Sequence, residues 1–266
     1  MPERTSYEPG TPSWMDLSTT DPEGAAAFYT AVFGWGRRDV PVDDQGNVYT
    51  MFLVGDKRVA AQSAMDPEQQ AHGIPSHWNT YVNVASADDA AARAEASGGT
   101  VLVAPFDVLD EGRMAVIQDP AGGILAVWEP GKTAGADLVQ EAGALAWNEL
   151  MTDDTGAAAS FYGDVFGWQP ETRVMSQGQE YTSFKLGDAY VAGMMAKTAD
   201  MGDVPSAWMA YYAVDDVDAA ADRAREAGGG IVAEPFDVPE VGRIAIIADP
   251  LGAVLGIMKY AAPQEG

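Results

Sequence analysis

The strongest constraint on this chain of 266 residues is an internal repeat. The segment 28–35, Phe-Tyr-Thr-Ala-Val-Phe-Gly-Trp, returns at 161–168 as Phe-Tyr-Gly-Asp-Val-Phe-Gly-Trp. Shorter matches follow in the same order along each half, such as Pro-Phe-Asp-Val at 105–108 and 235–238. Two copies of one pattern predict two copies of one fold, paired about a pseudo-two-fold axis, with a pocket between or within them.

The repeat also sets the expected domain boundaries. We expect the first module at residues 13–132 and the second at 143–260, each of ordinary domain size. Residues 133–142 are mostly small and polar and are expected to form the linker. Residues 1–12 and 261–266 show no periodic pattern, so we expect loose N-terminal and C-terminal tails there.

Within each module the pattern predicts strand, helix, strands, helix, strands. Asp21 and Pro22 have the character of an N-cap and a first helical residue, and Gly34 is placed to end the helix that they begin. The alanine-rich segment 88–97 predicts a second helix, and the turn residues at 119–122 precede a last strand. Because the second half repeats this order, we expect two modules of the α+β class.

Composition excludes several classes of function. The chain carries 40 acidic and 15 basic residues, a net charge of −25, which repels nucleic acids and anionic membranes. Without cysteine it has no disulfides, thiolate nucleophiles or cysteine zinc sites. The sequence offers neither a secretory signal nor a membrane span, so we expect a cytoplasmic protein. A monomer that pairs its own modules and a homodimer both remain open.

Two repeated signals also carry a family resemblance. One is Phe-Tyr at 28–29 and 161–162, each followed by Phe-Gly-Trp at 33–35 and 166–168; the other is the Asp-Pro-x-Gly turn at 119–122 and 249–252. The chain resembles the vicinal oxygen chelate superfamily of glyoxalases, extradiol dioxygenases and bleomycin resistance proteins, and more narrowly the tandem glyoxalase-like proteins of actinobacteria. The resemblance covers nearly all of both modules. It implies that each module is a pair of βαβββ units forming a cup of curved mixed sheet. Because this fold hosts both enzymes and binding proteins, it does not by itself define the chemistry.

The resemblance also implies where a divalent metal would be held: on the first strand, on a middle strand and on the last strand of a module. The residues at those positions are Trp14, Asn79 and Ala126 in the first module and Trp147, Met209 and Gly256 in the second. Tryptophan, alanine, methionine and glycine do not ligate hard or borderline dications. We therefore expect no metal of the family type and no other cofactor.

The chain has only two histidines, His72 and His77. Both precede the same predicted strand, and we interpret them as solvated loop residues. A site in which they converge with Asp16 or Glu68 is the alternative.

In a strand, residues two apart share a face, which assigns side chains to the inside of each cup. The residues expected to bind a ligand there are Trp14, Phe52, Asn79, Tyr81, Trp128, Trp147, Phe184, Met209, Tyr211 and Met258. Rings and thioethers of this kind favour a flat aromatic compound. Trp14 and Trp147 have a second interpretation, in which they fill the interface between the modules.

Two carboxylates fall on the same predicted faces. Asp16 follows Trp14 by two residues, and Glu149 follows Trp147 in the same way. Burial would raise the pKa of each carboxyl group, which suits a general base, so both are candidate catalytic residues. The alternative is a structural hydrogen bond. Arg113 and Arg243 are instead expected to pair with aspartates, and the Pro-Phe-Asp-Val segments to form lids or rims beside the cups.

Together these features predict a metal-independent protein that binds an aromatic or polyketide-like small molecule, in resistance or biosynthesis. One alternative is an enzyme of the same superfamily, a hydroxylase, cyclase or lyase that uses Asp16 or Glu149 as a base. Another is a glyoxalase or extradiol dioxygenase with displaced metal ligands.

Overall fold

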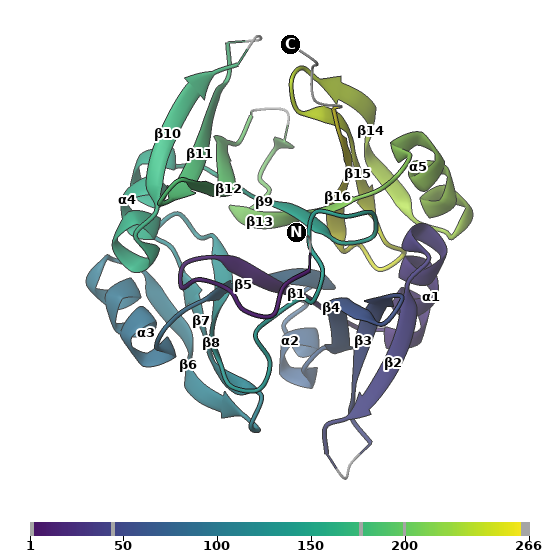
Figure 1. Cartoon of the computed structure of the whole chain (residues 1–266), viewed down its shortest axis with the longest axis horizontal. Helices are drawn as coiled ribbons and strands as arrows, with labels where there is room; N and C mark the ends of the chain where they lie inside the picture. The colour runs from purple at the N-terminus through teal and green to yellow at the C-terminus, as the bar shows by residue number, and fades with distance from the viewer. Residues whose placement is uncertain (1–2, 44–45, 176–177, 199–200, 262–266) are drawn as a thin grey trace.

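The computed structural model describes residues 3–43, 46–175, 178–198 and 201–261. It contains two eight-stranded mixed sheets, one in each module. Figure 1 shows the sheets curving away from each other, with α3 and α4 on one flank of the molecule and α1 and α5 on the other. In the first module the helices are α1 (Pro22–Phe33), α2 (Pro67–Ala71) and α3 (Ala87–Ala96). In the second they are α4 (Thr155–Phe166) and α5 (Val217–Glu226).

The first sheet has the strand order β2-β3-β4-β1-β5-β8-β7-β6. Its strands are β1 (Pro12–Thr19), β2 (Gly36–Pro41), β3 (Val48–Val54), β4 (Lys57–Ala64), β5 (His77–Asn83), β6 (Thr100–Val108), β7 (Gly112–Gln118) and β8 (Ile124–Pro130). The two central strands, β1 and β5, run antiparallel, and β1 pairs parallel with β4. Two βαβββ units therefore meet at the centre of one sheet, as the sequence predicted.

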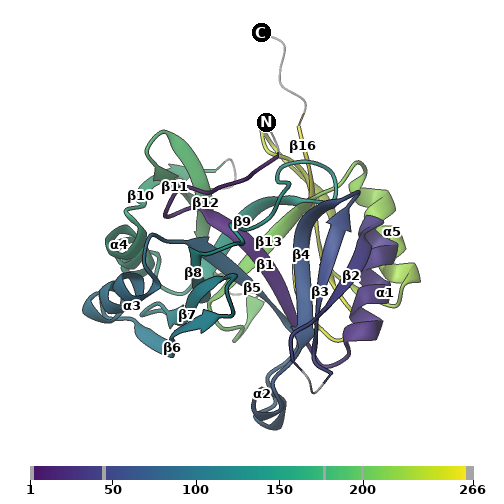
Figure 2. The same ribbon diagram turned by 60° about the horizontal axis from the view of Figure 1, so that its bottom comes forward.

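The second sheet repeats this order as β10-β11-β12-β9-β13-β16-β15-β14. Its strands are β9 (Leu145–Thr152), β10 (Gln169–Val174), β11 (Glu180–Leu186), β12 (Ala189–Ala196), β13 (Ala207–Ala213), β14 (Gly230–Val238), β15 (Gly242–Ala248) and β16 (Val254–Tyr260). The short helix α2 lies apart from the other helices (Figure 2). Among the described residues, no helix is long and apolar enough to cross a membrane.

Local signals explain where the long helices begin and end. Asp21 caps α1 by accepting a hydrogen bond from the backbone N–H of Gly24 at 3.0 Å, and Pro22 follows as the first helical residue. Gly34 ends α1 in the left-handed conformation, with φ of 72°. In the second module, Asp154 and Gly167 cap α4 in the same way. These helix boundaries confirm the sequence prediction.

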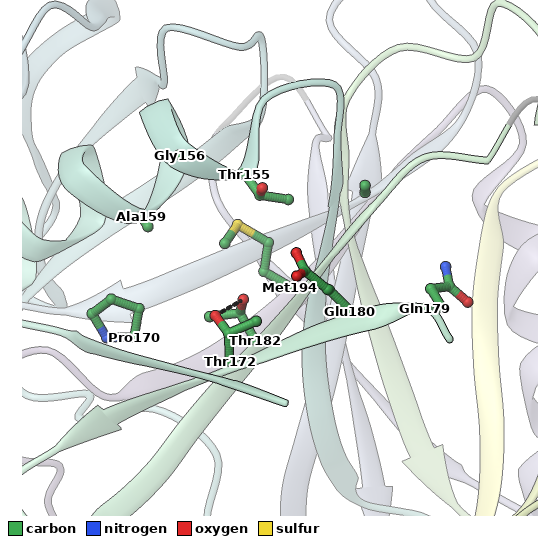
Figure 3. A pocket seen from close by; sticks show the side chains of 10 residues that line it. Thr155, Gly156, Ala159, Pro170, Thr172, Gln179, Glu180, Thr182 and Met194 are labelled. Atoms are coloured by element: carbon green, nitrogen blue, oxygen red, sulfur yellow. Dashed lines mark hydrogen bonds between the residues drawn. The ribbon is translucent and has the colours of Figure 1, made fainter. Parts of the chain in front are cut away.

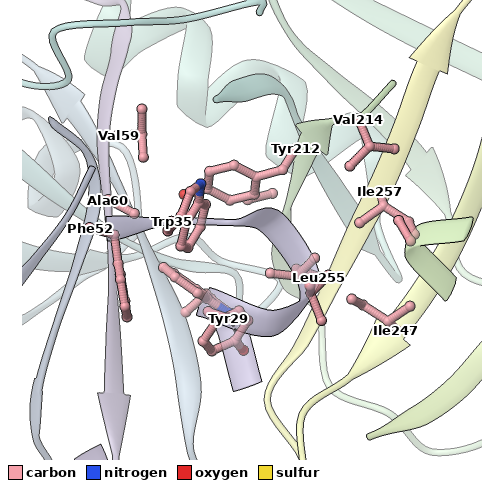
Figure 4. Close-up of a cluster of buried hydrophobic side chains, with 14 of the residues drawn as sticks. Tyr29, Trp35, Phe52, Val59, Ala60, Tyr212, Val214, Ile247, Leu255 and Ile257 are labelled. Carbon is pink, nitrogen blue, oxygen red and sulfur yellow. Dashed lines mark hydrogen bonds between the residues drawn. The ribbon is translucent and has the colours of Figure 1, made fainter. Parts of the chain in front are cut away.

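The helices of one module pack into the other module. The buried core around α1 includes Tyr212 and Leu255 from the second module, as Figure 4 shows. Tyr29 on α1 donates a hydrogen bond to Asp249 Oδ2 at 3.1 Å, and Tyr162 on α4 donates one to Asp119 Oδ2 at 2.7 Å. Each Phe-Tyr helix is thus tied to the Asp-Pro-x-Gly turn of the opposite module. The molecule is an internal pseudo-dimer.

The indoles of Trp78 and Trp208 belong to these helix-side cores. Each donates a hydrogen bond to the tyrosine hydroxyl that bridges the modules, Tyr29 at 3.0 Å and Tyr162 at 2.9 Å. Both indoles therefore pack in the helix-side cores and not in the cups.

The Pro-Phe-Asp-Val segments, expected as lids or rims, are not lids: they belong to the edge strands β6 and β14. They lie beside the cups as rims, because Val108 and Val238 pack against the cup clusters. The pairing register shifts between Val103 and Phe106 and between Ala233 and Phe236, so each proline sits where its ladder is irregular. A proline on an edge strand removes a donor that the sheet does not need, which is why the strand continues through it.

The N-terminal segment is also more ordered than predicted. Tyr7 Oη donates a hydrogen bond to the carbonyl of Ala136 at 2.7 Å, and the carbonyl of Tyr7 accepts one from Asn83 Nδ2 at 2.6 Å. Further along, the carbonyl of Gly10 accepts the indole N–H of Trp168 at 2.7 Å. Residues 3–11 are therefore fastened to both modules. Residues 262–266 of the expected C-terminal tail lie outside the described residues.

Candidate functional site

Each sheet has a second face, directed away from the helices, which we call the cup of its module. The first cup contains a buried cluster formed by Trp14, Ala61, Tyr81, Ala126 and Trp128 of the sheet, together with Ala136 and Val139 of the linker. The second contains a buried cluster formed by Ala146, Met209, Tyr211, Ala213, Ile244 and Met258. Rings and thioethers thus line both cups, as predicted from the alternation of residues along the strands.

A hydrogen-bonded carboxylate lies in the first cup. Asp16 Oδ2 accepts hydrogen bonds from the hydroxyls of Tyr49 and Tyr81, both at 2.9 Å. Its other oxygen, Oδ1, accepts one from Asn79 Nδ2 at 3.0 Å. Tyr49 in turn accepts the indole N–H of Trp14 at 2.9 Å. The strand register explains this convergence, because Asp16 lies opposite Asn79 on β5, and Trp14 opposite Tyr81.

The second cup repeats this chain of groups with different members. Tyr211 donates its hydroxyl to Glu149 Oε1 at 2.9 Å, and Trp147 donates its indole N–H to Tyr181 Oη at 2.8 Å. The Tyr181 hydroxyl also lies near the Glu149 carboxyl group and counteracts the effect of burial on its pKa. Opposite Glu149 on β13 stands Met209, at the position that Asn79 holds in the first cup. The repeated unit is therefore Trp–Tyr–carboxylate–Tyr, and only the first cup adds an amide.

Burial dominates the electrostatics of both units. It raises the pKa of Asp16 and of Glu149 above their ordinary values, while the hydrogen bonds from tyrosine, and from Asn79 to Asp16, oppose the rise. Desolvation and the neighbouring carboxylate raise the pKa of Tyr49, Tyr81 and Tyr211 well above 10, so these phenols stay protonated and donate. Each unit can accept a hydrogen bond or a proton from a neighbouring group.

The metal positions implied by the resemblance do not fit a dication. At the last-strand position of the second module, a Cβ on Gly256 would come within 2.1 Å of Tyr211 Cδ1, so the Tyr211 ring fills the space where a ligand side chain would stand. In the first module that position is Ala126, inside the buried cluster. Within the described ranges, no three His, Cys, Asp or Glu side chains are grouped to hold a metal.

His77 is not a loop residue, because it is the first residue of β5, and His72 ends α2. Among the described residues the two histidines do not converge with carboxylates on a metal site. The His72 and His77 rings each lie within hydrogen-bonding distance of a backbone carbonyl through Nδ1, that of Glu68 at 2.8 Å and that of Pro75 at 2.9 Å. The residues around the histidines and in the cups therefore do not fit a metal ion.

Most predicted site residues lie in the cups, but two do not. Phe52 and Phe184 are fully buried in the helix-side cores, on the opposite faces of β3 and β11. Assigning them to the cups was wrong by one residue of register, because alternation places Tyr49 and Tyr181 on the cup side instead. Those tyrosines were missed as site residues, although both stand in a repeated segment that begins Tyr-Thr.

The structure distinguishes the two interpretations of the first-strand tryptophans. Trp14 belongs to the first cup's cluster, and Trp147 packs against the cluster of the second. Neither belongs to the cores that join the modules.

The two arginines have the structural partners predicted for them. Arg113 pairs with Asp107 at 2.9 Å and Arg243 with Asp237 at 3.1 Å. Each also binds an aspartate on a neighbouring helix, Asp88 or Asp218.

A cavity of about 370 Å³ lies outside the cups, between α4 and the strands β10–β12. Figure 3 shows the bonded pair Thr172 and Thr182 on one wall, beside Met194. In the first module, Arg37 bound to Glu23 at 2.8 Å and Gln62 bound to the Pro22 carbonyl at 2.6 Å occupy the corresponding positions. The two modules therefore differ on both faces of their sheets. Because this cavity does not touch either carboxylate unit, the cups remain the candidate site.

Comparison with known proteins agrees with the fold and with the repeat. The family described as Glyoxalase/Bleomycin resistance protein/Dioxygenase superfamily matches residues 11–127 and again residues 144–257. "Putative glyoxylase CFP32" of Mycobacterium tuberculosis is 44% identical over the whole length of both chains. "Anthracycline biosynthesis protein DnrV" of Streptomyces peucetius is 37% identical, covering 96% of this chain and 95% of its own.

Among solved structures, the Mn(II)-bound glyoxalase from Novosphingobium aromaticivorans superposes with a TM-score of 0.64 at 17% identity. The match covers 95% of this chain and 83% of that one. At this identity the likeness extends to the fold alone.

Proposed function

Because the chain belongs to the glyoxalase/bleomycin resistance protein/dioxygenase superfamily, with one module in each half, we propose that it binds an aromatic, polyketide-like small molecule in its cups. The observation that carries this proposal is the Trp–Tyr–carboxylate–Tyr unit, which is repeated in both cups with its tryptophan at the first-strand metal position of the family. Such a site recognises a guest by stacking and area burial and by a hydrogen bond to the carboxylate, without a metal.

The free energy expected from covering the guest's apolar surface is large enough for binding. Covering about 200 Å² of apolar guest surface contributes roughly 5 kcal/mol before ordering costs. The thioethers of Met209 and Met258 let the wall adapt to the outline of a polycyclic ring system. The name of the Streptomyces relative, an anthracycline biosynthesis protein, supports an aromatic polyketide as the class of guest.

A second candidate function rests on the raised pKa of Asp16 and Glu149. A carboxylate that burial makes more basic can remove a proton from a bound phenol or activated carbon, which is how a cyclase, lyase or hydroxylase of this fold would use it. The same residues would carry either function, so only the formation of a product distinguishes an enzyme from a binding protein.

Titration with an anthraquinone tests both candidates. We expect saturable quenching of tryptophan fluorescence, with the compound recovered unchanged by mass spectrometry; recovery of a new product would favour the enzyme. The double variant Asp16→Asn, Glu149→Gln should weaken binding about tenfold, the equivalent of one hydrogen bond to a charged group. Asp188→Asn, in an exposed turn, is the matched control. Unchanged affinity in the double variant would show that the two carboxylates do not contribute to binding.

A further inference from the structure

The two cups do not offer a guest the same hydrogen-bonding groups. In the first, the Asn79 amide occupies one oxygen of Asp16, while two hydroxyls occupy the other. In the second, the described hydroxyl that donates to Glu149 is that of Tyr211, with Tyr181 close by. A carboxylate accepts about four hydrogen bonds, so Glu149 keeps more capacity for an added donor than Asp16, which already accepts from Tyr49, Asn79 and Tyr81. The Met209 thioether stands where the amide would be and gives none.

The first cup is also covered by chain from outside its strands. Tyr7 from the N-terminal segment and Ala136 and Val139 from the linker pack into its cluster. The linker is held there by Asp137, which binds the Arg58 guanidinium at 2.7 Å, and by the Thr133 carbonyl, which accepts the indole N–H of Trp128 at 2.8 Å. The described part of the second cup's cluster comes from its own strands and the turn at 239–241.

The second cup is deeper by a methyl group at two places. Gly193 and Gly256 take the positions of Ala61 and Ala126 in the strand pairing. A Cβ on Gly193 would lie 1.9 Å from Tyr181 Oη, so this hydroxyl sits directly against the sheet. The Tyr211 ring likewise lies against Gly256. Both tyrosine side chains therefore lie closer to the sheet than alanine at these positions would allow, which leaves more space on the side of the cup opening. Trp147 is half-buried, whereas Trp14 is only 8% exposed.

From these differences we infer that the second cup is the binding site, and that its guest is a flat aromatic compound that presents a phenolic hydroxyl or amine to Glu149. This inference rests on the proposed function and assigns that function to one module. The donor of the guest would hydrogen-bond Glu149 as the Asn79 amide hydrogen-bonds Asp16 in the first cup. Met209 has a flexible side chain that can yield to the guest, whereas Asn79 is fixed by its bond to Asp16.

Substitutions in both cups test the inference on the full chain. The probe is 2,6-dihydroxyanthraquinone, titrated by calorimetry, with 2,6-dimethoxyanthraquinone as its matched partner without donors. We expect one equivalent of the dihydroxy compound to bind, about tenfold more tightly than the dimethoxy compound. Met209→Asn supplies the missing amide and should weaken binding about tenfold, as should Glu149→Gln. Met209→Leu, which adds no amide, should weaken binding less than Met209→Asn, and Asp16→Asn should weaken it less than Glu149→Gln. Asp188→Asn, in an exposed turn, should leave affinity and stoichiometry unchanged.

The outcomes separate the inference from the function beneath it. Binding that survives Met209→Asn and Glu149→Gln but fails in Asp16→Asn would move the site to the first cup and overturn the inference alone. Equal affinity of the unmodified chain for the dihydroxy and dimethoxy compounds would show that the site does not recognise a hydrogen-bond donor on the guest, and would overturn the inference. This measurement can be made even if Met209→Asn does not fold. Failure of the unmodified chain to bind either compound would overturn the proposed function and the inference together.

Discussion

In the first cup an amide N–H from Asn79 meets the Asp16 carboxylate, whereas in the second the Met209 thioether faces Glu149 across the same pair of strands. The cups share the groups that hydrogen-bond around these two positions: a tryptophan on the first strand of the module, two tyrosines and a buried carboxyl group. The first cup therefore satisfies its own polar groups and is closed by neighbouring chain. The second satisfies them less fully and has a lower floor.

The comparison teaches that repeated geometry does not imply repeated use. The helix-side cores of the two modules have the same cross-module bonds, so we expect substitutions there to act alike. The cups differ in donors, depth and cover, so we expect substitutions there to act differently.

The largest effects should come from the shared cores. Tyr162→Phe removes the hydroxyl that donates to Asp119 Oδ2 and accepts from Trp208, so this buried oxygen and the buried indole N–H each lose that partner. We expect a loss of about 2–4 kcal/mol in the free energy of unfolding, measured with urea. Tyr29→Phe, its counterpart, should cost about the same. Clearly unequal losses would show that the asymmetry of the cups extends into the cores.

Alanine at the glycine floor should have the next largest effect. Gly256→Ala places a Cβ 2.1 Å from Tyr211 Cδ1, near the base of the ring, and should destabilise the fold by about 1–3 kcal/mol. Gly193→Ala meets the tip of Tyr181, which is half-buried and can swing away, so its cost should be smaller. Thermal and urea unfolding measure both variants. A neutral Gly256→Ala would contradict a Tyr211 ring seated against the sheet.

A smaller effect should follow from loosening the cover of the first cup. Tyr7→Phe removes the 2.7 Å bond to the Ala136 carbonyl and should cost about 1 kcal/mol, with faster hydrogen exchange in residues 131–139. Tyr260→Phe is the control, because its hydroxyl bonds the Ala146 carbonyl at 3.0 Å from an exposed position. If hydrogen exchange in residues 131–139 does not change, the Tyr7 hydroxyl does not hold the linker over the first cup.

The smallest expected effect is a dependence on pH. Burial raises the pKa of Glu149 in the folded state above its ordinary value of 4.5, so its contribution to stability is complete below that value and is lost as pH rises through the folded pKa. The free energy of unfolding of the unmodified chain minus that of Glu149→Gln should therefore fall as pH increases above about 4.5.

Asp16→Asn should show the same sign from its ordinary value of 3.8 upward. The slope should be weaker, because the Asn79 amide opposes the effect of burial there. A difference that rises with pH at either site would contradict a raised pKa. Urea titrations at a series of pH values measure both slopes.

Much of the fold could be predicted because its signals are local. Asp21, Pro22 and Gly34 define one helix by capping alone, and the repeat transfers that assignment to the second module. The edge strands were missed for the opposite reason. Their residues, such as Phe106 and Phe236, are more than 40% exposed, so they do not show the buried alternation that reveals a strand.

The site was only partly predictable, because alternation gives two faces without saying which is the cup. Tyr49 and Phe52 lie in one strand on opposite faces, and both are aromatic, so side-chain type did not separate them. Asn79 was assigned to the cup from the family resemblance and from its two-residue spacing to Tyr81, and only the structure shows that it lies opposite Asp16. The cross-module bonds of Tyr29 and Tyr162 join residues more than 40 positions apart, which no local pattern records.

Those cross-module bonds bear on how the two copies came to differ. Since α1 reaches the turn of the second module and α4 that of the first, a single module would need a partner copy in the same arrangement. In a symmetric pair of separate chains, any substitution appears twice. Joining both copies in one polypeptide removes that requirement, so a substitution can alter one cup and leave the other unchanged.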